Sequence, residues 1–142
     1  MKYGVLTTRR LLFFGFLLVL SVVLAFIYYN KFYYHEIAAQ DLAHAYTKDA
    51  ISANIEFLDK RLNLLGQVKS YLVLPNAGPV LELKTYPEDI PLMCYFNNEE
   101  DQHTASRLRE DQNVSIKGKC LGLNADTLIG GLKFNAISLN PE

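Results

Sequence analysis

The chain has few of the residues from which catalytic and metal sites are usually built. Its 142 residues include only two cysteines and three histidines, and they contain no C-x-x-C pair. His35, His44 and His103 are scattered, with no spacing that would place two imidazoles on one helical face. We therefore expect these residues to hold neither a metal ion nor a cofactor.

Loops that hold phosphates or activate nucleophiles are also missing. We find no Gly-rich phosphate loop and no nucleophile elbow. The paired acids Glu88-Asp89 and Glu99-Glu100-Asp101 lie beside Pro and Asn residues, which is typical of solvated loops rather than of carboxylates facing each other across a cleft. The sequence thus predicts a protein that is not an enzyme and has no small-molecule substrate.

Charge is absent from Leu11–Tyr29, a run of nineteen residues that follows Arg9 and Arg10. A helix of this length covers roughly 28 Å, close to the thickness of a bilayer's hydrocarbon core. Basic residues precede the run and almost none follow it directly, so we expect a cytosolic N-terminus and a periplasmic or otherwise extracytoplasmic C-terminal part. This pattern predicts a single-pass protein of the cell inner membrane. Its parts are a basic tail (1–10), a signal anchor (11–29), a juxtamembrane region with an amphipathic helix (30–60) and a folded domain (61–140).

A cleaved signal peptide is the alternative interpretation of this run. Val23-Leu24-Ala25 places small residues where cleavage before Phe26 would need them. However, Phe26–Tyr29 continues the apolar stretch where a polar segment is expected, and further aromatic residues follow, as in an interfacial belt. We therefore favour the uncleaved anchor.

The part of the chain beyond the anchor is mildly acidic. Residues 30–142 carry eleven Lys/Arg and fifteen Asp/Glu, a net charge of −4. Because partners with a phosphate backbone require a basic surface, this balance argues against nucleic acid as the partner.

Hydrophobic periodicity changes once along this part. From His35 to Lys60 there is no Pro or Gly, and one apolar stripe recurs at helical spacing, which predicts an amphipathic helix of about twenty residues. The stripe comprises Leu42, Tyr46, Ala50, Ala53 and Phe57.

After Lys60 the period becomes two, as expected for strands. We expect strands from Leu62 toward Leu74, at Val80–Thr85, Leu92–Phe96 and Val114–Cys120, and from about Leu132 to Leu139, with a helix over 98–110 capped by Asn98 or Asp101. This β-β-β-α-β-β order matches the five-stranded Greek-key OB barrel, with a small open sandwich as the alternative. Gly66 and Gly118 lie on faces that point inward, where a small barrel needs room to bend. The predicted fold class is mainly β with helices.

The chain from Ala39 to Leu139 resembles the bacterial tRNA_anti-like family of small envelope OB-fold proteins. The resemblance rests on barrel-forming positions: Leu64-x-Gly66-x-Val68, Leu81-x-Leu83, Leu92-x-Cys94-x-Phe96 and Val114-x-Ile116-x-Gly118-x-Cys120-x-Gly122. Asp111 stands where the family usually has a turn glycine, and Asp tolerates a left-handed turn better than most residues. Ala136 stands where the family often has a cysteine, so Cys94 is the only partner left for Cys120.

OB barrels bind ligands on the outer face of their second and third strands. In this chain the outward positions would be Glu82, Lys84, Tyr86, Met93 and Tyr95, with Lys69 and Tyr71 as neighbours on the first strand. These side chains could stack on a base or a sugar, or contact a protein. Alternatively, the apolar stripe of the preceding helix covers Tyr86, Met93 and Tyr95, and this is the interpretation that we favour.

Cys94 and Cys120 share faces with core positions of strands that are not neighbours in an OB barrel. A disulfide would have to cross the interior, so we favour two buried thiols over a bridge. The whole pattern predicts a non-catalytic, membrane-anchored interaction or accessory subunit with a protein partner. The alternative is an OB domain that binds nucleic acid or oligosaccharide.

Overall fold

The computed structural model describes residues 4–75, 77–124 and 130–141, with side chains described for 13–29, 33–75, 77–123 and 130–141. Residues 1–3 of the expected basic tail lie outside these ranges. The chain divides into two compact units, Met1–Tyr33 and Tyr34–Glu142.

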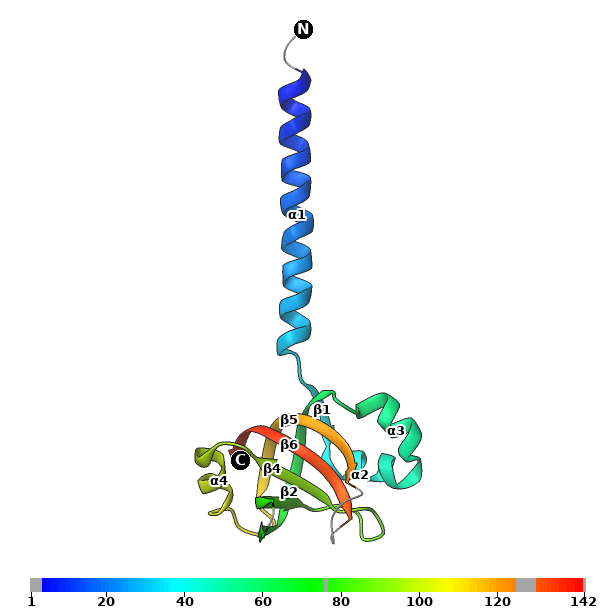
Figure 1. Ribbon diagram of the computed structural model, residues 1–142, viewed down its shortest axis with the longest axis vertical. Coiled ribbons are helices and arrows are strands. Elements are labelled where there is room, and N and C mark those ends of the chain that lie inside the picture. The colour runs from blue at the N-terminus through cyan, green and yellow to red at the C-terminus, as the bar shows by residue number, and fades with distance from the viewer. Residues whose placement is uncertain (1–3, 76, 125–129, 142) are drawn as a thin grey trace. The chain divides into compact units, whose positions relative to one another are not determined.

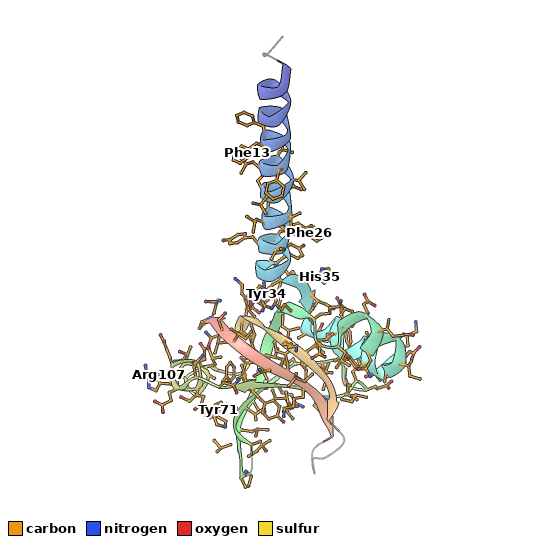
Figure 2. The ribbon with its side chains drawn as sticks, turned by 45° about the horizontal axis from the view of Figure 1, so that its top comes forward. Phe13, Phe26, Tyr34, His35, Tyr71 and Arg107 are labelled. Carbon is orange, nitrogen blue, oxygen red and sulfur yellow. The ribbon has the colours of Figure 1, made fainter. Side chains whose placement is uncertain are left out.

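The first unit is one continuous helix, α1, over Gly4–Phe32. Its described side chains run from Phe13 to Tyr29, and all of them are exposed. Figure 2 shows Phe13 and Phe26 projecting away from the helix. Among the residues with described side chains, no helix combines the length and hydropathy that crossing a membrane requires.

The second unit is built on a closed barrel. Its strands are β2 (Arg61–Leu74), β3 (Gly78–Leu83), β4 (Leu92–Phe96), β5 (Asn113–Asn124) and β6 (Gly131–Pro141), and helix α4 (Glu99–Ala105) connects β4 to β5. The strands follow the order β2-β3-β4-β6-β5, and β5 pairs back with β2. All pairs are antiparallel except β4 with β6 (Figure 1). This is the predicted β-β-β-α-β-β connectivity of an OB fold.

The sheet has six strands rather than the predicted five. The additional strand, β1 (His35–Ala38), pairs in parallel with the first half of β2, with Ile37 opposite Leu64. This half of β2 has β5 on one side, and β1 occupies its other edge. Local composition predicted a helix for residues 35–38. The structure has a strand there because these residues pair with residues 62–65, a contact that local composition does not report.

The single helix expected over 35–60 is also wrong as a continuous element. The structure has two helices, α2 (Ala39–Lys48) and α3 (Ala50–Phe57), separated at Asp49. The Asp49 side chain accepts hydrogen bonds from the backbone N–H groups of Ile51 and Ser52, so it caps a new helix. The expected apolar stripe is confirmed, since Leu42, Tyr46, Ala53 and Phe57 are buried and Ala50 packs against the core.

The helices α2 and α3 lie on the opposite side of the barrel from α4 (Figures 1 and 2). The helix α4 is shorter than expected, but Asn98 caps it by accepting from the Asp101 N–H at 2.6 Å. Asp111, which follows, has φ +67°, so it adopts the left-handed turn that its place in the sequence suggested.

Two glycines allow close approach of neighbouring chain segments. A Cβ atom at Gly118 would lie 2.3 Å from the backbone oxygen of Asn135, and one at Gly66 would lie 2.9 Å from the Cβ of Ala39. The absence of a side chain at Gly118 therefore allows β5 to lie close to β6. The absence of one at Gly66 allows the first residue of α2 to pack directly on the barrel.

Candidate interaction surface

Strand register separates the outward side chains of the barrel from the inward ones. One outward row contains Ser70, Glu82, Met93 and Lys133, and the next contains Leu72, Val80, Tyr95 and Asn135. Between them, an inward row runs through Tyr71, Leu81, Cys94, Phe134 and Cys120. The expected outward positions of Glu82, Met93 and Tyr95 agree with this register, whereas Tyr71 belongs to the inward row and packs against the core.

Glu82 is the buried charge of this face, only 8% exposed. Its carboxylate accepts a hydrogen bond from Lys69 Nζ at 2.7 Å and another from Ser70 Oγ at 2.9 Å. The register shift of β2 between Val68 and Ser70 falls at Lys69. These two donors compensate for the desolvation of Glu82, because burying a charged group is costly unless it is paired and hydrogen-bonded.

Lys84 is held by two acidic residues of the segment between α4 and β5. Its ammonium group forms ion pairs with Asp111 and, at 3.7 Å, with Glu110. The hydrogen bond to Asp111 raises the pKa of Lys84 above its ordinary value. Like Lys69, this lysine is already neutralised by carboxylates of the same chain.

Lys69, Glu82, Lys84 and Tyr86 meet around one open pocket of about 420 Å³. Its remaining wall comes from Thr85, Pro87, Asp89, Pro91 and Glu110. Four of the seven residues expected on a binding face are therefore brought together; we call the four the pocket face. Met93 is buried, and Tyr95 lies apart from the pocket, with Lys133 Nζ 4.7 Å from its ring centroid.

Two residues of α2, His44 and Thr47, hold the segment 86–90, which forms one wall of this pocket. His44 Nδ1 lies 3.2 Å from an oxygen of Asp89, the Thr47 hydroxyl accepts from the Ile90 N–H at 3.1 Å, and the His44 and Tyr86 rings meet edge to face. Sequence reasoning missed the His44–Asp89 pair, because its members are 45 positions apart and share no motif.

The alternative that we favoured from the sequence, in which the apolar stripe covers Tyr86, Met93 and Tyr95, is wrong. The stripe residues Leu42, Tyr46 and Phe57 join the barrel core instead. Tyr86 contacts His44, which lies outside the stripe, and stays 47% exposed.

Both cysteines are buried and unbridged. They stand opposite the same residue, Phe134, from the strands on either side of β6. That places them two strand spacings apart, roughly 9–10 Å, whereas a disulfide needs Cα atoms within about 6.8 Å. Burial raises the pKa of both thiols, although the Tyr46 hydroxyl, 3.5 Å from Cys120 Sγ, partly offsets this at Cys120.

Neither thiol is therefore expected to react with iodoacetamide in the folded protein, even at pH 9. An exposed thiol with the ordinary pKa of 9.0 would be half ionised there, but burial keeps these thiols neutral. The contribution of the neutral thiols to the free energy of unfolding is therefore complete below pH 9 and is lost as the pH rises further, because the thiols of the unfolded chain ionise there while the buried thiols stay protonated. Mass spectrometry after alkylation should show two labels in urea without reductant; labels that require prior reduction would contradict the free thiols.

The described residues contain no group of three or more His, Cys, Asp or Glu side chains arranged to hold a metal ion. His44 pairs with Asp89, while His35 and His103 are exposed on β1 and α4.

Several solved structures are similar to this chain. Asparaginyl-tRNA synthetase from Pyrococcus horikoshii shares 17% identity over 74% of this chain and 22% of its own, with a TM-score of 0.49. The small single-stranded DNA-binding protein of Streptomyces coelicolor shares 13% over 59% of this chain and 93% of its own, with a TM-score of 0.43. The Stn1-Ten1 complex of S. pombe shares 14% sequence identity over 58% of this chain and 57% of its own, with a TM-score of 0.44.

This chain thus spans about a fifth of the length of the synthetase. Among curated proteins, none matches the chain. The tRNA_anti-like family model matches residues 1–129, which include most of the barrel, and the chain belongs to this family.

Proposed function

We propose that the protein is a single-pass, non-catalytic interaction module, with α1 as its membrane anchor and the barrel as its binding domain. The anchor is supported by the nineteen uncharged residues from Leu11 to Tyr29 and by the exposure of every described side chain of α1. Apolar side chains in this number on one helix need a non-aqueous environment, and a lipid bilayer supplies one. In a protein of the cell inner membrane, Lys2, Arg9 and Arg10 favour a cytosolic N-terminus, which would place the barrel on the extracytoplasmic side.

A protein partner is favoured by one observation, the internal pairing of the lysines on the pocket face. Lys69 pairs with Glu82, and Lys84 pairs with Glu110 and Asp111. A phosphate backbone gains affinity from cations that are free to replace its counterions. Because these lysines already have carboxylate partners, the face presents charges of both signs that a complementary protein surface can match, beside an exposed tyrosine, a residue type enriched at protein interfaces.

The pocket face can be tested by photo-crosslinking in intact membranes. We expect a benzoylphenylalanine in place of Tyr86 to form discrete adducts with a protein, since this ring is exposed at the pocket rim. The same group in place of Arg107, exposed beyond α4, is the matched control and should form none. Equal adduct patterns from both positions, or adducts that nuclease removes, would contradict a protein partner at this face.

Nucleic acid or oligosaccharide is the second candidate, favoured by Tyr95 and Lys133 on the outer face. Their cation–π contact forms an aromatic and basic pair of the kind on which a base or a sugar ring stacks. Micromolar binding of a labelled oligonucleotide at physiological salt, about −8 kcal/mol, would favour this candidate over a protein partner.

The anchor leads to a separate expected result. Protein extracted from membranes should retain its first thirty residues, because the apolar run continues past Ala25 through Phe26–Tyr29. Intact-mass measurement after extraction decides the point, and carbonate washing of the membranes is the control for peripheral association. A species that begins at Phe26 would exclude the anchor.

A further inference from the structure

The helix α3 is apolar on both sides. Ala53 and Phe57 are buried in the core, whereas Ile51 and Ile55, one helical turn apart, are 76% and 79% exposed. The exposed Ser52 and Glu56 also belong to α3, but large apolar side chains that are exposed together usually mark an interaction site. The outer side of α3 is therefore expected to have an occupant.

Three more exposed leucines lie at the end of α3 or on β5, the strand that α3 contacts. Leu58 follows directly after α3 and lies near Gly122 of β5, where an added Cβ would be 3.0 Å from Leu58 Cδ1. Leu121 and Leu123 flank Gly122 and are 37% and 45% exposed. We call Ile51, Ile55, Leu58, Leu121 and Leu123 the α3 apolar face, which is separate from the pocket face.

Charges around the α3 apolar face nearly cancel. The segment 48–61 together with residue 119 has a net charge of +1, from four bases (Lys48, Lys60, Arg61 and Lys119) and three acids (Asp49, Glu56 and Asp59). Asp59 pairs with Lys119 at 2.8 Å, and Asp49 is used as the cap of α3. An occupant is thus selected by apolar contact rather than by charge of one sign.

We propose that this occupant is the interfacial layer of the lipid bilayer. The inference rests on the membrane anchor of the proposed function. Only Tyr33 and Tyr34 separate α1 from β1, a connection of about 7 Å when extended. A domain on so short a tether meets the bilayer surface at a high effective concentration, so a contact too weak to recruit a free domain becomes occupied.

Tryptophan fluorescence tests this contact, because the chain contains no tryptophan. We would compare full-length Ile55→Trp with full-length Val73→Trp in phosphatidylcholine nanodiscs, with and without bromine atoms near the headgroup end of the acyl chains. Val73 is a matched control, an exposed β-branched residue on β2, at 70% exposure. The tryptophan of Ile55→Trp should be quenched at least roughly twofold by the brominated lipids, since interfacial helices bury their apolar side at that depth.

The control tryptophan should stay unquenched, and high salt should change neither result because the surrounding charges nearly cancel. Equal, weak quenching of both variants while the chain stays in the nanodisc would overturn the lipid contact but leave the anchor intact. Shielding of the Ile55→Trp side chain from iodide without quenching by bromine would indicate a protein or a second copy, and would likewise overturn it. Loss of the chain from the nanodisc fraction would overturn the anchor and the lipid contact together.

Discussion

Gly118→Ala is expected to destabilise the barrel by about 3 kcal/mol or more, a large part of the stability of a small domain. The added Cβ would lie 2.3 Å from the Asn135 backbone oxygen and 2.5 Å from the Phe134 ring. A flexible side chain could move aside, but the obstructing oxygen belongs to the strand that β5 must pair with. The substitution therefore opposes closure between β5 and β6 itself.

Urea unfolding, followed by near-ultraviolet circular dichroism of the tyrosines, measures this loss. Gly130→Ala is the matched control, because a Cβ at Gly130 meets nothing within 4 Å. A Gly118→Ala protein as stable as this control would show that β5 can shift without losing its pairing.

Phe134→Ala is expected to cost about 3–5 kcal/mol and to lower Tm by roughly 10–20 °C. Phe134 is among the largest fully buried side chains, and it lies between Cys94 and Cys120 in the inward row. Its removal leaves a cavity beside the two cysteines that lie opposite it on the neighbouring strands, and such a cavity adds to the cost of the lost burial.

Phe134→Leu should lose clearly less, because it keeps most of the apolar volume. Val73→Ala, at an exposed position, should stay within about 0.5 kcal/mol of the natural chain. The same unfolding measurement serves all three variants. Equal losses for Phe134→Ala and Phe134→Leu would mean that the barrel collapses around the missing ring.

The barrel could be predicted because its strands carry their own signal. In Leu92–Phe96 the alternation of side chains gives both the strand and its inward face, and the structure has the strand at the same bounds. β1 could not be found in this way. Its four residues form a strand only because the edge of β2 is open to them, and no local pattern reports an open edge.

In the candidate site, too, local alternation predicts some features, whereas others depend on contacts between distant segments. Glu82 and Lys69 lie on adjacent strands, so an outward face containing both could be predicted from alternation alone. Their ion pair, and that of Lys84 with Asp111, depend on a bulge in β2 and a left-handed turn before β5. His44 reaches Asp89 only through the position of α2 on the barrel, which depends on packing rather than on sequence spacing.

The pairing of β1 with β2 also bears on how the domain would respond to a force applied through α1. Any pull that reaches the barrel through α1 acts first on β1, the strand that follows it in the chain. Four residue pairs join β1 to β2, whereas seven join β2 to β5 at the closure of the barrel. Because closure does not involve β1, we expect a load on α1 to detach this strand before the barrel opens. The detached strand would lengthen the connection between α1 and the barrel while the barrel stays folded.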